Sequence, residues 1–192
     1  MAVSCVATPI LAWARNWEVL FYAVMISLFV GFLWYTDRFF HYAKTSLFLL
    51  LVWLVLHICG GVVPIGEGRV LYHWVVVPLI PEPYSILKFD QVMHAFCYVV
   101  IGLLVDDAIA PLLKQGLPRV ARFMIVTLVA AGIGALNEVM EFAAVCMFPG
   151  TSVGDYTNNV LDLVFNTIGA LTAATIRLRT RDLLIHTSRS VN

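Results

Sequence analysis

Charged residues are scarce in this sequence, and their scarcity excludes a water-soluble protein. Only 12% of the 192 residues are Asp, Glu, Lys or Arg, whereas 61% are hydrophobic. An ordinary soluble domain has about 25% charged and roughly 45–50% apolar residues. A net charge is missing too, because twelve basic residues balance twelve acidic ones, so no nucleic-acid-binding surface is expected. We therefore predict that the main partner of the chain is membrane lipid.

Paired cysteines and familiar enzyme motifs are also absent. The four cysteines form no C-x-x-C pair, so neither a zinc ribbon nor a disulfide framework is expected. No Walker loop and no H-E-x-x-H helix is present to indicate a reaction. Residues 1–16 lack a basic region followed by a long apolar core, so we expect the first span to direct insertion rather than a cleaved signal peptide.

Long apolar runs are what the sequence does contain. Five segments approach the ~20 residues that an α-helix needs to cross a bilayer. They cover about residues 17–35, 43–63, 91–109, 120–148 and 159–176. Backbone groups in lipid must be hydrogen-bonded within the segment, and no run alternates as a barrel strand does, so all five are predicted to be helices. The predicted fold is an all-α polytopic membrane protein, a single transmembrane domain over residues 1–192.

Basic residues are divided unevenly between the two ends of these helices. One side has Arg15, Arg69 and Lys88. The other side has nine, which are Arg38, Lys44, Lys114, Arg119, Arg122, Arg177, Arg179, Arg181 and Arg189. This bias predicts that the amino terminus faces outward and that the carboxyl terminus, with the tail 177–192, is cytoplasmic.

Two segments outside the spans are apolar enough to stay near the membrane. Residues 64–90 on the outer side are rich in proline and aromatic residues, and we predict a flap that lies on the membrane surface or dips into the bundle. Residues 1–16 are too short to span, so an interfacial stretch with Trp13 and Trp17 near the headgroups is expected.

Several ionisable and amide side chains in or at the edge of the spans lie within ~15 Å of the outer surface, at ~1.5 Å per helical residue. These residues are His57, Asp90, His94, Glu138, Glu141, Asp162 and Asn166. Asp90 and His94 are four residues apart, and Glu138 and Glu141 are three apart, so each pair shares one helix face. Because carboxylates cannot face lipid, we expect these faces to converge in a polar pocket that opens outward.

The acids of this pocket have no built-in partner, since no Lys or Arg lies in the spans at their depth. Each ionised acid costs ~2.5–3.5 kcal/mol at mid-helix, so protons, histidines, Arg69 or Lys88 from the flap, or a bound cation must supply positive charge. Imidazoles with several carboxylates form a donor set that suits Zn, Mn, Fe or Mg. The predicted ligands are His57, His94, Glu138, Glu141 and Asp162.

Roles beyond ligation follow from the same residues. We predict Glu138, Glu141 and Asp162 as catalytic, because a carboxylate that is not a ligand could act as general base. Other residues also have a structural interpretation. His57 can be a hydrogen-bonding linker, and Cys97 a packed thiol. Helix capping can explain Asp90, Asn158 and Asn159, whereas Asp106 and Asp107 are interpreted as solvated boundary charges.

Four short motifs resemble known membrane proteins. They are LHICGG at 56–61, FDQVMH at 89–94, NEVME at 137–141 and DLVFNTIGA at 162–170, with GDY at 154–156 between the last two. In order and spacing the sequence resembles the VanZ-like group and the uncharacterised bacterial inner-membrane family typified by YjdF. The resemblance implies a multi-pass protein of the bacterial inner membrane, associated with the cell envelope. It also adds Asp155 and supports Asp90 and Asn166 as further site candidates.

The leading functional hypothesis is a metal-assisted site in the outer half of the bundle that acts on a lipid or lipid-linked envelope substrate. One alternative is a non-enzymatic binder of a small molecule or cation, or a proton-coupled carrier. Another is an assembly partner whose acids pair with basic residues of a second membrane chain. The substrate, the metal and the oligomeric state are left open by the sequence.

Overall fold

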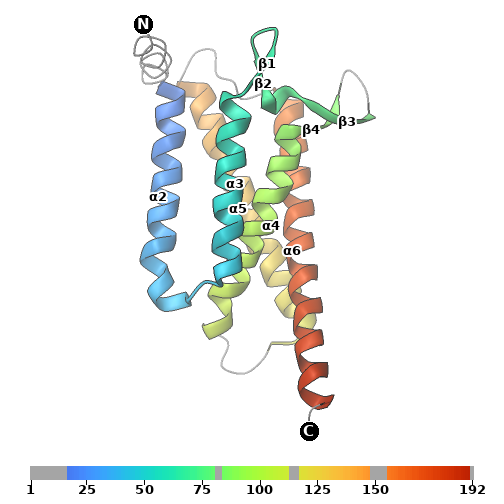
Figure 1. Ribbon diagram of the computed structural model, residues 1–192. Helices are drawn as coiled ribbons and strands as arrows, with labels where there is room; N and C mark the ends of the chain where they lie inside the picture. The colour runs from blue at the N-terminus through green and yellow to red at the C-terminus, as the bar shows by residue number, and fades with distance from the viewer. Residues whose placement is uncertain (1–16, 81–83, 113–116, 148–154, 191–192) are drawn as a thin grey trace, which may run out of the picture.

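The computed structural model describes residues 17–80, 84–112, 117–147 and 155–190, and side chains from residue 20 to 180 within these ranges. Within these residues five α-helices form a bundle (Figure 1): α2 (Trp17–Phe40), α3 (Lys44–Val62), α4 (Phe89–Ile109), α5 (Arg119–Met147) and α6 (Tyr156–Ser190). Each is long and apolar enough to cross a membrane, as predicted. The interfacial stretch expected over residues 1–16 lies outside the described residues.

Two helices extend past the ends of their apolar runs. α2 continues to Phe40. α6 continues to Ser190, although the sequence predicts that the helix ends at residue 176 and that a cytoplasmic tail follows. Neither extension contains a glycine or proline, and polar residues such as Arg are good helix formers. Hydropathy therefore located the spans but not the ends of the helices.

The predicted flap folds into two short β-hairpins around a 3₁₀-helix. β1 (Pro64–Gly66) pairs with β2 (Arg69–Val70), and β3 (Val75–Ile80) pairs with β4 (Ile86–Lys88), both antiparallel. Helix η1 (Leu71–His73) lies between the hairpins. The chain is therefore mostly helical rather than all-α, because prolines and β-branched valines disfavour helix in this segment.

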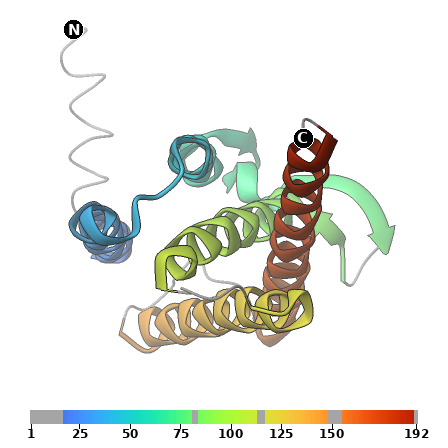
Figure 2. The same cartoon turned by 90° about the horizontal axis from the view of Figure 1, so that it is seen from below.

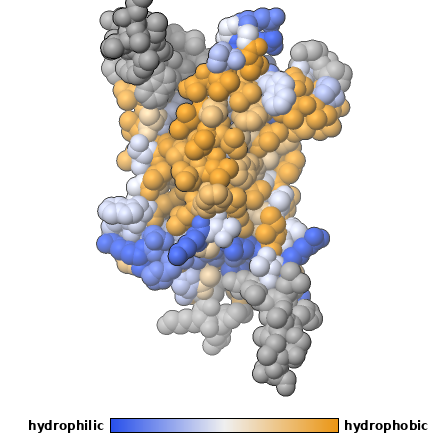
Figure 3. All heavy atoms as spheres, viewed as in Figure 1, coloured by the Kyte–Doolittle hydropathy of each residue, from blue (hydrophilic) through white to orange (hydrophobic). Residues whose placement is uncertain are grey.

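The two ends of the bundle differ in structure and in the polarity of their surfaces, and we call the end that carries the strands the hairpin end. The hairpin end carries β1–β4, and there α3 and α5 end while α4 and α6 begin (Figure 1). Hydrophilic residues form a band at the opposite end, and between the two ends the visible surface is apolar (Figure 3). Large side chains such as Trp34 and Leu28 are 83% and 63% exposed. Such a surface is suited to lipid rather than water.

Helix α4 lies at the centre and packs against α3, α5 and α6, whereas α2 lies at the edge of the bundle (Figure 2). The approach of α4 to α6 depends on small residues. A Cβ atom at Gly169 would overlap the backbone carbonyl of Ala95, and one at Gly102 would overlap Ala173. Small residues at a helix interface let the backbones approach closely, and this approach positions the site described next.

Candidate metal centre

Three helices bring polar side chains together at the hairpin end. The first two turns of α4 supply Asp90 and His94, and the start of α6 supplies Asp162. The last turns of α5 supply Glu138 and Glu141. Asp162 is 1% and Glu138 is 4% exposed, so this polar group is enclosed by the helices, as the sequence predicted.

The imidazole of His94 faces two carboxylates. Its Nε2 atom lies 3.7 Å from Oδ1 of Asp90 and 3.8 Å from Oδ1 of Asp162. These separations are too long for direct hydrogen bonds. Oδ1 of Asp162 is buried and has no hydrogen-bond partner among the described residues. Ligand atoms from these three residues all lie within 4.8 Å of one another, which makes them a group that could hold a metal ion.

Asn158 holds the two carboxylates from their other side. Its Nδ2 donates to Oδ2 of Asp162 at 2.7 Å and lies 3.4 Å from Oδ2 of Asp90. Each aspartate therefore turns one oxygen to the amide and the other toward His94. The sequence interpreted Asn158 as a helix cap, whereas its side chain orients two acids of the site.

A chain of hydrogen bonds orients the imidazole ring of His94. Glu138 accepts hydrogen bonds from two amides, Nδ2 of Asn166 to Oε1 and Nδ2 of Asn159 to Oε2, each at 2.9 Å. Because Asn166 gives its NH₂ group to the carboxylate, its Oδ1 faces Nδ1 of His94 at 2.9 Å. An amide oxygen only accepts, so Nδ1 of His94 carries a hydrogen, and Nε2 is the ring nitrogen that faces the aspartates.

A second group overlaps with the first but is less available for a metal. It consists of His94, Glu138 and Glu141, whose ligand atoms also lie within 4.8 Å of one another. In this group the Nδ1 atom of His94 is engaged by Asn166, and both oxygens of Glu138 accept amide hydrogens. Glu141 accepts one hydrogen bond, from Asn137 at 2.8 Å. We therefore assign Asp90, His94 and Asp162 as the better ligand set.

His57, a predicted ligand, belongs to neither group within the described part of the chain. Its Nδ1 lies 2.5 Å from the hydroxyl of Tyr72, and its ring stacks on Trp53 with centroids 4.9 Å apart. The Tyr72 hydroxyl donates to the backbone carbonyl of His57 at 2.8 Å. Burial, followed by the charges of Asp90 and Glu141, raises the pKa of Tyr72, so the hydroxyl stays protonated at neutral pH. The arrangement fits the linker interpretation, in which His57 anchors η1 to α3.

One further acid of the prediction, Asp155, has a simpler role, whereas Asp90 does not. Asp155 is exposed, and its Oδ1 accepts the backbone N–H of Asn158 at 3.0 Å, as a helix cap does. Asp90, interpreted as a cap, is not one: Gln91 instead accepts the backbone N–H groups of Leu87 and Lys88 at 2.6 and 3.1 Å. Asp90 is thereby left to face His94.

Cys97 packs beside a hydrophobic cluster, in agreement with the interpretation as a packed thiol.

The prediction that Asp106 and Asp107 are solvated boundary charges is wrong. Asp106 is 3% exposed and pairs with Nε of Arg122 at 2.5 Å. Arg177 binds Asp107 at 2.5 Å, and Ser46 donates to the same carboxylate at 2.7 Å. The continuation of α6 past residue 176 brings Arg177 to α4, which the apolar run did not indicate. We call these two aspartates and two arginines the inner ion cluster.

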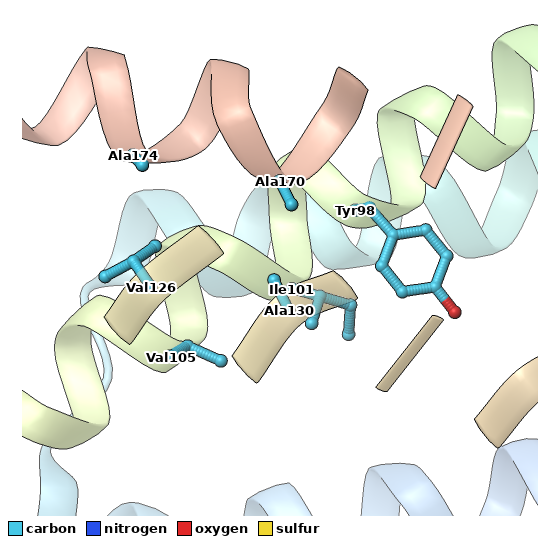
Figure 4. Packing of buried hydrophobic residues seen from close by; sticks show 7 residues of the cluster. All are labelled: Tyr98, Ile101, Val105, Val126, Ala130, Ala170 and Ala174. Carbon is cyan, nitrogen blue, oxygen red and sulfur yellow. The ribbon is translucent and has the colours of Figure 1, made fainter. Parts of the chain in front are cut away.

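An apolar layer separates the inner ion cluster from the candidate metal centre. Its buried side chains point toward one another from three helices (Figure 4): Tyr98, Ile101 and Val105 of α4, Val126 and Ala130 of α5, and Ala170 and Ala174 of α6. Along α4 these residues lie between His94 and Asp106, and along α6 between Asn166 and Arg177. The centre is therefore closed toward the opposite end.

Comparison with known proteins gives a family for the chain. Residues 1–183 match the family described as predicted membrane protein (DUF2238). The chain belongs to this family. The match agrees with the five apolar helices and supports the membrane-protein part of the resemblance, without a VanZ-like or YjdF-type name. No curated protein and no solved structure matches the chain.

Proposed function

We propose that the protein is a metalloprotein of the bacterial inner membrane that binds a divalent ion between Asp90, His94 and Asp162. The observation that carries the proposal is the Nε2 atom of His94, which faces one oxygen of Asp90 and the unpartnered Oδ1 of Asp162 at distances too long for direct hydrogen bonds. Two carboxylates gathered in a buried site repel each other, and a divalent cation bound between them would remove this repulsion. Asp162 is only 1% exposed, so water does not fully screen this repulsion.

The residues fit Zn, Mn, Fe or Mg in type. One imidazole and two carboxylates are ligands that these ions accept, and three protein ligands leave positions for water and substrate. Two aspartates balance the charge of a divalent ion. The hydrogen bonds from Asn158 to the aspartates and from Asn166 to His94 supply the outer contacts that orient ligands in metal sites.

The chemistry that we propose is hydrolysis of a lipid or lipid-linked envelope substrate. A bound divalent ion supplies Lewis-acid activation of water and of the bond to be cleaved. A ligand atom of Glu141 lies within 4.8 Å of one of His94, and Glu141 is outside the proposed ligand set, so we assign it as the base that would take a proton from the attacking water. Glu138 is not a base in this scheme, because both of its oxygens hold amides that orient His94 and α6.

The end of the bundle at which the site lies supports an envelope substrate. Basic residues such as Arg38 and Arg177 belong to the opposite end of the bundle, which favours a cytoplasmic location for that end. The hairpin end and the metal centre would then face outward. The apolar layer below the centre favours a site with one open end over a carrier path through the bundle.

Metal analysis of detergent-purified protein tests the proposal. After equilibration with Zn, Mn, Fe and Mg in turn and removal of free ion, we expect one ion per chain for at least one metal. Asp162→Asn and Asp90→Asn should each lose it, because each removes a charged ligand. Asp155→Asn, an exposed acid at the start of the same helix α6, should retain it. A folded wild-type chain without bound metal would contradict the proposal.

A lipid assay tests the hydrolytic part separately. Protein reconstituted into vesicles of total bacterial lipid should release a water-soluble headgroup product only with the bound metal. Glu141→Gln should retain the metal and lose the release, because it removes the proposed base and leaves the ligands in place. Equal release by wild type and Glu141→Gln would contradict the role of Glu141 and the hydrolytic scheme.

A further inference from the structure

The two hairpins at the hairpin end have opposite surface chemistry. The β1–β2 turn carries Glu67 and Arg69, which form an exposed ion pair at 2.6 Å with side chains 79% and 52% accessible. β3 contains only valine, proline, leucine and isoleucine. Neighbouring side chains of a strand point to opposite faces, so Leu79 and Ile80, 62% and 47% exposed, leave both faces of β3 apolar.

The position of β3 indicates what covers it. The β3–β4 hairpin projects sideways from the bundle, past α6 in both ribbon views (Figures 1 and 2). The apolar surface of the helices continues onto this side of the molecule (Figure 3). The chain belongs to a membrane protein family, so the apolar surface of its helices faces lipid. Because the apolar surface of the hairpin continues from that of the helices, the same lipid can cover the hairpin.

The backbone of the hairpin limits how deep it can lie. Within the described residues β3 pairs with β4 alone, so its other edge presents backbone groups that hydrocarbon cannot satisfy. The headgroup boundary provides both water for these groups and acyl chains for the valines and leucine. Trp74 and Tyr84, 49% and 52% exposed, flank β3 and are residue types enriched at this boundary.

We propose that the β3–β4 hairpin is a lipid-binding element that lies in the headgroup boundary of the outer leaflet, next to the proposed metal centre. β4 leads directly into α4, where Gln91, fully buried, holds the backbone of Leu87 and Lys88. The backbone N–H of Phe89 donates to the carbonyl of Trp74 at 2.8 Å. The base of the hairpin is thus fixed next to the ligand Asp90.

This connection deepens the proposed function by specifying the substrate class. A lipid that lies along the hairpin keeps its acyl chains in the leaflet while its headgroup reaches the aspartates. The substrate is therefore an amphiphile delivered sideways from the membrane rather than a solute from water. This part of the inference rests on the proposed function, whereas the location of the hairpin does not.

Spin-label accessibility tests the location. A nitroxide is attached at Leu79→Cys, in a chain whose four native cysteines are replaced by alanine, reconstituted in vesicles of phosphatidylcholine and phosphatidylglycerol. We expect the label to be accessible to oxygen and shielded from a water-soluble nickel complex. The matched label at Glu67→Cys, on the polar turn of the other hairpin, should show the reverse. Equal nickel accessibility at both positions would overturn the inference, as would dipolar broadening showing that β3 pairs with a second copy.

A charged substitution in the hairpin allows the lipid-binding inference to be tested independently of the proposed metal binding. In Leu79→Glu the metal content should equal that of the wild type, because no ligand or its support is changed. A phosphatidylglycerol with a photoreactive acyl chain should cross-link to residues 75–88 of the wild type and several-fold less to Leu79→Glu. Undiminished cross-linking would overturn the hairpin inference. A metal-free wild type with the expected cross-link would instead overturn the proposed function alone.

Discussion

His94 is the residue whose surroundings determine the chemistry of the site. Its Nδ1 is fixed by Asn166 and its Nε2 faces Asp90 and Asp162. The sequence predicted His94, Asp162 and Asn166 from their depth in the apolar spans. It could not predict the direction of the Asn166 amide, because that direction depends on Glu138 of another helix.

Glu138→Gln tests this hydrogen-bond chain without removing a proposed ligand. A glutamine can donate to Oδ1 of Asn166, which allows the Asn166 amide to turn and donate to Nδ1 of His94. The imidazole hydrogen then moves to Nε2, where it blocks metal binding. We expect the metal affinity to fall by roughly 10- to 100-fold, the usual effect of losing an outer contact of a ligand.

Two measurements check this prediction. Metal titration gives the affinity, and ¹⁵N NMR of histidine-labelled protein reports which ring nitrogen carries the hydrogen. Glu141→Gln is the matched control, because it makes the same change one helical turn away and has no contact with Asn166 in the part of the chain described here. Equal affinities for the two variants would contradict the role assigned to Glu138.

The inner ion cluster supports a second prediction at the scale of residues. Arg122 is 8% exposed and pairs with the buried Asp106. Arg122→Gln leaves that carboxylate less well paired, so we expect a loss of about 3–5 kcal/mol in the free energy of unfolding. Arg69→Gln, which breaks the exposed pair with Glu67, should change it by no more than about 1 kcal/mol. Unfolding in mild detergent measures both, and similar losses would contradict a structural role for the cluster.

At the scale of elements, the site depends on how closely α4 and α6 approach. Asp90 and His94 lie on α4, whereas Asp162 and Asn166 lie on α6. The four residues can meet only because Gly169 contacts the backbone of Ala95. The contact lies less than one full turn from Asn166 in sequence, so a small displacement of the helices acts directly on the metal centre.

Gly169→Ala is predicted to disturb both the fold and the site. The added methyl group overlaps the carbonyl of Ala95, and such overpacking typically costs about 1–3 kcal/mol. We also expect weaker metal binding, because the helices separate. Gly132→Ala on α5 is the control, since a Cβ atom there has no neighbour within 4 Å. The account would be contradicted if Gly169→Ala retained both wild-type stability and wild-type metal affinity.

The sequence predicted the helices whose position is determined by hydropathy. Five apolar runs gave five helices, because the backbone must satisfy itself in lipid. The strands of the flap were missed because their runs are only two to six residues long. The extension of α6 was missed because polar residues end an apolar run without ending a helix, and the pairing of Arg177 with Asp107 was missed with it.

At the scale of the whole molecule, charge is distributed differently at the two ends. In the inner ion cluster two arginines balance two aspartates. At the hairpin end, Asp90, Asp162, Glu138 and Glu141 gather around one histidine. The apolar layer between them prevents one cluster from neutralising the other. In the proposed function a divalent cation supplies positive charge to the acids at the hairpin end, and this is the claim on which the proposed chemistry depends.

X-ray absorption spectroscopy of the metal-loaded, detergent-purified protein tests this claim most directly. The account predicts a first shell of oxygen and nitrogen at about 2.0–2.2 Å with the multiple-scattering signal of one imidazole. In Asp162→Asn this signal should disappear together with the ion. A shell of oxygen alone, a sulfur ligand at about 2.3 Å, or an unchanged spectrum in Asp162→Asn would contradict the assignment of Asp90, His94 and Asp162 as the ligands.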